Sequence, residues 1–153
     1  MLFEINGYDK WRHIFGTTKA DARLRDIELI TRFFALNEMK YSKPMKEFLN
    51  TFMGKHQWDS KIEGYKTLFT GTVDSVYKAL GTKPFNVKRG INAAVFDSVM
   101  VAFAKNTKIP RDVGQRYKKL LANKSYDDAI KAHTTDVDTV KQRLELAEEV
   151  LFH

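Results

Sequence analysis

The chain has 153 residues, of which 43% are hydrophobic and 29% are charged, and its formal net charge is +7. This length and composition suit one soluble globular domain over residues 1–153 and exclude a disordered segment. No stretch approaches the roughly 18 apolar residues of a membrane span, and the first residues lack the pattern of a secretory signal. Cysteine is absent, which excludes disulfides and thiolate chemistry and fits a reducing cytosol. We therefore expect a cytoplasmic protein without a membrane partner.

The hydrophobic spacing is helical almost throughout, and no alternating strand pattern of convincing length is present. The predicted helices cover residues 8–15, 21–38, 44–53, 59–80, 93–104, 110–121 and 125–133, with a last helix that starts near Thr135. The predicted N-caps are Ser42, Asn92 and Ser125. The predicted C-terminal stops are Gly16, Gly54, Gly81 and Asn123. The expected fold class is all-α, a single compact bundle of about seven or eight helices.

The second predicted helix is apolar on most of its circumference and yet carries several charges. An unpaired buried charge is costly, so we expect Arg25, Asp26 and Arg32 to belong to a buried charge network that fixes the helix register. Asp97 interrupts the very apolar segment 93–104 and is the expected partner within that network. Its candidate partners are Arg23, Arg25 and Arg32. The alternative is that Asp26 and Arg32 line a functional groove.

Positive charge is concentrated between residues 105 and 124, where Asp112 is the one acid. The basic residues are Lys105, Lys108, Arg111, Arg116, Lys118, Lys119 and Lys124. Such a segment can bind nucleic acid or an acidic partner protein, and a solvated helix face is the alternative. The loop residues Lys83, Lys88 and Arg89 could join this surface. Tyr117 lies among these lysines, where an aromatic ring can stack on an unpaired base.

Catalytic patterns are missing from the sequence. The four histidines are His13, His56, His133 and His153, and none stands at a metal-ligand spacing from another histidine or an acid. There is no glycine-rich phosphate loop, and no nucleophile stands beside a base and its orienting group. We therefore expect no metal, no cofactor and no enzymatic activity.

Several blocks along the chain carry a family resemblance. The first is Arg25-x-x-Glu28-Leu29-x-x-Arg32-Phe33-Phe34-Ala35-Leu36, and the second is Tyr41-x-x-Pro44-Met45-Lys46-x-Phe48-Leu49-Asn50-x-Phe52-Met53. Weaker blocks are Trp11-Arg12, Asn92-x-x-Val95-Phe96-Asp97-x-Val99-Met100-Val101, and Thr134-Thr135 leading to Val140-x-x-Arg143-Leu144. In this order they resemble the helical part of the GmrSD-type restriction endonuclease N-terminal domain family.

In that family a ParB/sulfiredoxin-like, nucleotide-hydrolysing portion precedes the helical bundle. Its Asp-Gly-Gln-Gln-Arg-type motif is absent here, and so is a downstream His-Asn-His-type nuclease domain, so no catalytic residue is carried over. The resemblance implies a non-catalytic helical module of an anti-phage restriction system, whose partner is a nucleotide-hydrolysing or nuclease half. One alternative is a phage- or mobile-element-encoded decoy that inhibits a host defence protein. The other is a nucleic-acid-binding domain that uses its basic helix.

Overall fold

The chain folds entirely into helices and loops in the ranges that the structure, a computed structural model, describes, which are residues 1–56 and 60–153. The helices are α1 (Leu2–Asn6), α2 (Asp9–Phe15), α3 (Arg25–Glu38), α4 (Met45–His56), α5 (Ile62–Leu80), α6 (Ala93–Lys105), α7 (Val113–Ala122), α8 (Lys124–Lys131) and α9 (Val137–Phe152). The all-α prediction is therefore confirmed, and the helix that it missed is α1, with only 5 residues. No helix in these ranges is both long enough and apolar enough to cross a bilayer.

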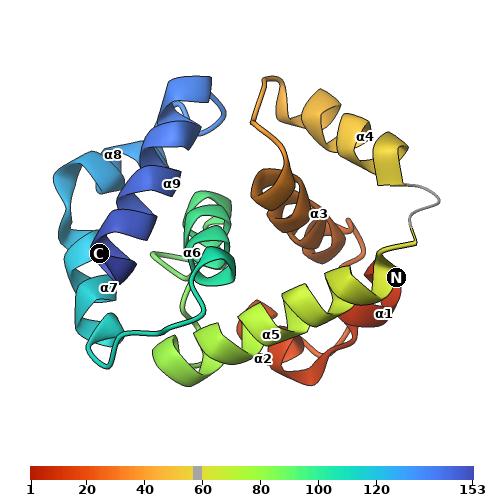
Figure 1. The fold of residues 1–153 in the computed structure, drawn as a ribbon, viewed down its shortest axis with the longest axis horizontal. Helices are drawn as coiled ribbons and strands as arrows, with labels where there is room; N and C mark the ends of the chain where they lie inside the picture. Colours follow the sequence, from red (N-terminus) through yellow and green to blue (C-terminus); the bar gives the residue numbers. More distant parts are fainter. Residues whose placement is uncertain (57–59) are drawn as a thin grey trace.

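Helix α6 lies at the centre of the molecule, with α3, α5 and α9 packed around it (Figure 1). Every residue of α6 from Ala94 to Phe103 is buried, which explains why this segment is apolar on all sides. Aromatic rings connect the surrounding layers, since Trp11 lies 5.6 Å from both Phe69 and Phe96, measured between ring centroids. Burial of these large rings supplies much of the hydrophobic stabilisation.

The remaining helices cover this centre from the outside. Helix α4 packs on α3, helices α7 and α8 pack on α9, and α1 and α2 pack against α3 and α5 respectively. The N-terminus lies near α1 and the start of α5, whereas the C-terminus lies beside α7 on the other side of the molecule (Figure 1). Helix α7 also contacts the end of α5, and this contact forms the site described below.

Helices α3 and α4 differ from the prediction at their ends. Helix α3 begins at Arg25 rather than at residue 21, because the Asp21 carboxylate accepts hydrogen bonds from the Arg23 and Arg25 amides at 2.8 and 3.3 Å and holds a turn there. Ser42 does not cap α4, whose first turn is closed by the Phe48 amide on the Pro44 carbonyl. Gly54 lies inside α4, which continues to His56.

Three predicted helix boundaries are confirmed by backbone and cap geometry. Gly16 ends α2 with φ at 93°, and Gly81 ends α5 with φ at 85°, a region that favours glycine. Asn92 caps α6 by accepting hydrogen bonds from the Ala94 and Val95 amides at 2.9 and 3.1 Å. The predicted start of α5, at residue 59, lies outside the described residues, and α5 begins at Ile62.

The boundary between α7 and α8 corrects two predictions. Asn123 is not a left-handed stop, since its φ is −71° and its side chain accepts a hydrogen bond from the Tyr126 amide at 3.0 Å. It therefore caps α8 in place of Ser125, which lies inside that helix. Pro110 precedes α7 by a turn, which the Val113 amide closes on the Pro110 carbonyl.

Candidate nucleic-acid interface

Two clusters of buried charge connect helices inside the bundle, and Asp97 is the centre of the first. Its carboxylate accepts from Arg32 Nε at 3.0 Å and Nη2 at 2.5 Å, and from Arg143 Nη2 at 3.2 Å. All three side chains are buried, so this cluster connects α3, α6 and α9. Burial alone would lower the pKa of Arg32, but the Asp97 carboxylate raises it above the ordinary value.

Arg143 was absent from the predicted network, although it is fully buried beside Asp97. Its Nη1 also donates to the Thr134 carbonyl at 2.5 Å. Burial lowers the pKa of Arg143, because the contact with Asp97 only partly compensates for the loss of water. The prediction that Arg25 belongs to the network is wrong, because Arg25 is exposed.

Asp26 belongs to a second and separate cluster. Its Oδ2 accepts from Asn6 Nδ2, Arg12 Nη1 and the Asp21 amide at 2.8 to 2.9 Å, and its Oδ1 accepts from the Ile27 amide at 2.9 Å. Burial would raise the pKa of Asp26, but these hydrogen bonds together lower it. The carboxylate therefore joins α1, α2 and α3.

The basic residues between 105 and 124 differ in whether an acidic side chain lies beside them. Arg116 Nε contacts Asp112 Oδ1 at 3.0 Å, and Lys105 Nζ lies 4.0 Å from Glu148 Oε2 on α9. These two cations are therefore partly neutralised within the molecule. The others are exposed and have no ion pair within residues 1–56 and 60–153; they are Lys108, Arg111, Lys118, Lys119 and Lys124.

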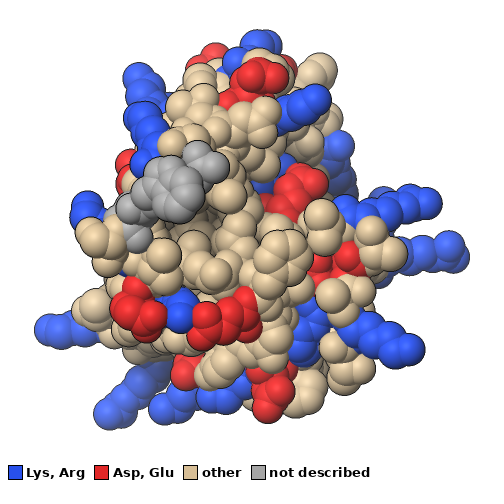
Figure 2. Space-filling model, turned by 90° about the vertical axis from the view of Figure 1, so that its right-hand side faces the viewer, with Lys and Arg blue, Asp and Glu red and all other residues tan. Residues whose placement is uncertain are grey.

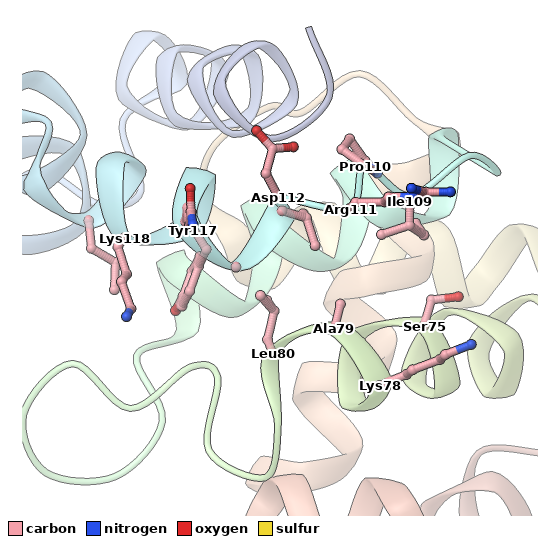
Figure 3. A pocket seen from close by; sticks show the side chains of 14 residues that line it. Ser75, Lys78, Ala79, Leu80, Ile109, Pro110, Arg111, Asp112, Tyr117 and Lys118 are labelled. Carbon is pink, nitrogen blue, oxygen red and sulfur yellow. The ribbon is translucent and has the colours of Figure 1, made fainter.

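A groove of about 1030 Å³ lies between the last turns of α5 and the start of α7. Three cationic side chains line it, namely Lys78, Arg111 and Lys118. Its apolar lining comes from Ala79, Leu80, Ile109, Pro110, Val113 and Leu121. In Figure 3, Ala79 and Leu80 lie between Lys118 on one side and Lys78 and Arg111 on the other. The groove thus combines an apolar floor with positive charge at both ends.

Tyr117 also lines this groove, and its hydroxyl donates to the Pro84 carbonyl in the loop that follows α5. Burial raises the pKa of the Tyr117 phenol to about 12. In Figure 3 the ring lies between Lys118 and Leu80. The hydrogen bond therefore holds the ring at the edge of the groove, and stacking of a base on it stays a prediction.

A smaller cavity of about 450 Å³ lies between the end of the same loop and α8. Lys88, Arg89 and Lys131 line it, and Asn92 Nδ2 ties the end of the loop to the Ile130 carbonyl of α8 at 3.1 Å. The loop cations Lys88 and Arg89 are thus held near α8. Lys131 in this lining is paired with Asp127 at 2.6 Å, so the loop supplies the cations of this cavity that have no acidic partner among the described residues.

The face that carries α4 and the start of α5 has a different character. Figure 2 shows that Lys and Arg side chains project mainly from the edges of this face, and that much of its centre is uncharged. On α5, Lys66 Nζ contacts Glu4 at 2.7 Å and Glu63 at 3.0 Å. We therefore place the candidate interface at α7 rather than on this face.

The residues that sequence reasoning missed in the groove are Lys78 and the apolar residues at the end of α5. Lys78 is exposed in the last turn of α5, far along the chain from the basic segment. Only the contact between α5 and α7 brings it near Arg111 and Lys118.

No group of three or more metal-ligating side chains occurs among the described residues. His56 Nε2 lies 2.7 Å from Glu38 Oε1, and the Tyr65 hydroxyl donates to Glu38 Oε2 at 2.6 Å. These contacts join the ends of α3 and α4 to the start of α5, which is a structural role.

Comparisons of the chain with protein-family models, with curated proteins and with solved structures found no match. The fold and the site define an all-α protein with a basic groove between α5 and α7.

Proposed function

We propose that this domain is a non-catalytic module that binds the phosphate backbone of nucleic acid through the groove between α5 and α7. The observation that carries the proposal is the convergence of Lys78, Arg111 and Lys118 on one groove. They come from two separate parts of the chain, and none has an ion pair in the part of the chain that the structure describes. Unpaired cations around a groove attract a polyanion.

Contacts with phosphates contribute to affinity but do not distinguish one nucleotide sequence from another. Each neutralised phosphate releases counterions, so binding weakens steeply as the salt concentration rises. Such contacts position a nucleic acid on a protein, while contacts with base edges would be needed for specificity. The groove cations therefore support a positioning role rather than sequence recognition.

The family resemblance gives this role a biological setting. If the chain is a helical module of a modification-dependent restriction system, it would hold nucleic acid for a nucleotide-hydrolysing or nuclease half supplied by a partner protein. The basic groove then serves anti-phage defence without a catalytic residue of its own.

Fluorescence anisotropy with labelled oligonucleotides at low salt tests the proposal. The test variant reverses three groove charges, Lys78→Glu, Arg111→Glu and Lys118→Glu. The matched control reverses three exposed lysines elsewhere, Lys40→Glu, Lys46→Glu and Lys55→Glu, and changes the net charge equally. We expect the groove variant to lose binding and the control to retain most of it. Equal losses, or no binding by the unaltered protein at low salt, would contradict the proposal.

A second candidate function is docking of a partner protein at the corner where α1 meets α5. Phe3 is 73% exposed and Ile62 is 39% exposed. Glu4 of α1 forms an ion pair at 2.7 Å with Lys66 of α5. Lys66 lies one helical turn after Ile62, so α1 lies beside the first turns of α5. A contiguous exposed apolar patch is typical of interaction sites, and the proposal is that these side chains belong to one. The occupant that we propose is the nucleotide-hydrolysing half of the family that the sequence resembles.

Co-purification with such a half tests the second candidate. Phe3→Ser with Ile62→Ser should abolish the complex, and Leu24→Ser, which changes a 50% exposed side chain elsewhere, should leave it intact. A complex that survives the first variant, or no complex with the unaltered chain, would exclude this corner as the docking site.

A further inference from the structure

We infer that the groove between α5 and α7 binds single-stranded nucleic acid in preference to duplex. One base would lie over Leu80 and against the Tyr117 ring, and the phosphates on its two sides would reach Lys118 at one end and Lys78 and Arg111 at the other. This inference rests on the proposed function and specifies its substrate class.

The apolar floor is the first argument. A duplex presents its charged backbone outward and keeps its bases stacked inside, so it would leave Leu80 and Pro110 uncovered. A single strand can turn an unpaired base toward the protein and bury apolar surface with it. The lining residues at the end of α5 and the start of α7 therefore match a strand whose bases are accessible.

The distribution of charge is the second argument. Lys118 lies at one end of the floor, and Lys78 and Arg111 lie at the other (Figure 3). In a single strand each base is flanked along the chain by two phosphates. A groove with cations at both ends and an apolar centre repeats that order of charged and uncharged groups.

Tyr117 supplies the third argument. Its ring lines the groove, and its hydroxyl is tied to the Pro84 carbonyl. This hydrogen bond fixes the ring before a ligand arrives, so less conformational freedom is lost on binding. Aromatic rings beside a positively charged groove are a common feature of proteins that bind single strands without sequence preference.

The polar lining indicates little readout of base identity. The Asp112 carboxylate, just before α7, contacts Arg116 Nε at 3.0 Å and is therefore already engaged. Apart from the three cations and Tyr117, the remaining polar side chains in the lining are Ser75, whose hydroxyl donates to the Gly71 carbonyl at 3.0 Å, and Gln115. We therefore expect a preference for strandedness rather than for a particular base.

The size of the groove argues against a mononucleotide as the occupant. At about 1030 Å³, the groove is slightly larger than the range of roughly 300–1,000 Å³ that is typical of small-ligand sites. A nucleoside monophosphate carries one phosphate and would engage the cations at one end only. An oligonucleotide engages both ends at once.

The test measures anisotropy of one labelled oligonucleotide as a single strand, as the same sequence in a duplex, and as single-stranded RNA. We expect both single strands to bind at least about tenfold tighter than the duplex, and excess nucleoside monophosphate to displace neither. Tyr117→Ala and Leu80→Ser should each weaken single-strand binding by about tenfold and leave duplex binding unchanged. Circular dichroism establishes that the variants are folded.

A third variant keeps the inference testable if Tyr117→Ala disturbs the loop. Tyr117→Phe retains the ring and should keep single-strand affinity within about threefold. The inference is overturned if the duplex binds as tightly as the single strand and the triple charge reversal in the groove weakens both. The proposed function would then still hold. If neither form binds at low salt, both fail. Displacement by nucleoside monophosphate would also overturn the inference.

Discussion

Arg32 on α3 and Asp97 on α6 form a two-point ion pair inside the helical bundle, with nitrogen–oxygen distances of 3.0 and 2.5 Å. The pair connects α3 and α6, which bury more of their residues than any other described helix, and Arg143 of α9 donates to the same carboxylate. A planar guanidinium held at two points fixes the orientation of both partners. The cluster therefore sets how α3, α6 and α9 meet.

Removal of the shared carboxylate should strongly destabilise the fold. In Asp97→Ala both Arg32 and Arg143 remain buried without their anion, and the loss of one partner of a buried pair costs about 3–5 kcal/mol. We expect a loss of this size in the free energy of unfolding, measured by urea denaturation. Asp138→Ala, at an exposed position on α9, is the control and should have little effect. A loss for Asp97→Ala as small as the control's would contradict a stabilising role for the cluster.

Stability below neutral pH should depend on Asp26. The hydrogen bonds to its carboxylate lower the pKa of Asp26 below the ordinary value of 3.8 in the folded protein. Above that ordinary value both states are ionised and the stabilisation is fully present. As the pH falls through 3.8 and on through the lowered folded pKa, the unfolded state binds the proton first and the stabilisation is lost.

The comparison of the unaltered protein with Asp26→Asn measures this contribution. We expect the difference between their free energies of unfolding to be largest near neutral pH and to shrink as the pH falls below about 4. Urea denaturation at several pH values checks it. A difference that stays constant down to about pH 2 would mean that ionisation of Asp26 does not stabilise the fold.

The sequence predicts the buried elements of this protein well, for a physical reason. Asp97 lies in a segment that is otherwise apolar, so its charge requires a partner, and one of its three candidates, Arg32, occupies that place. The same reasoning did not reach Arg143. Its buried side chain lies on a helix whose other positions include many exposed charges, and only the packing of α9 on α6 reveals it.

The groove was less accessible to prediction than the core. Arg111 and Lys118 belong to a visible basic segment, but Lys78 enters the site only because α5 ends beside α7. At a helix end, one residue can also have two alternative roles. An asparagine at position 123 can end α7 in a left-handed conformation or cap the N-terminus of α8. Its side chain accepts a hydrogen bond from the Tyr126 amide, so it caps α8. The placement of Lys78 depends on a tertiary contact, whereas the role of Asn123 depends on a hydrogen bond three residues along the chain.

Nucleic-acid binding should depend less steeply on salt concentration when one groove cation is removed. Lys118→Gln removes one phosphate contact. A plot of log binding constant against log salt concentration should therefore become less steep, by about 0.7 for a single strand. Anisotropy titrations between about 50 and 200 mM salt measure the slope. Lys46→Gln, an exposed lysine on α4, should leave it unchanged. An unchanged slope for Lys118→Gln would place the phosphates elsewhere.

Two cations of the same basic segment should contribute unequally to binding. Arg111 lines the groove, whereas Lys105 lies 4.0 Å from Glu148 on α9. Arg111→Gln and Lys105→Gln change the net charge equally, so a difference between them reports position rather than overall charge. At low salt we expect Arg111→Gln to weaken oligonucleotide binding by about three- to tenfold and Lys105→Gln by less than about twofold. Equal losses would show that the oligonucleotide responds to the net charge of the segment, and the groove would then have no special part in binding.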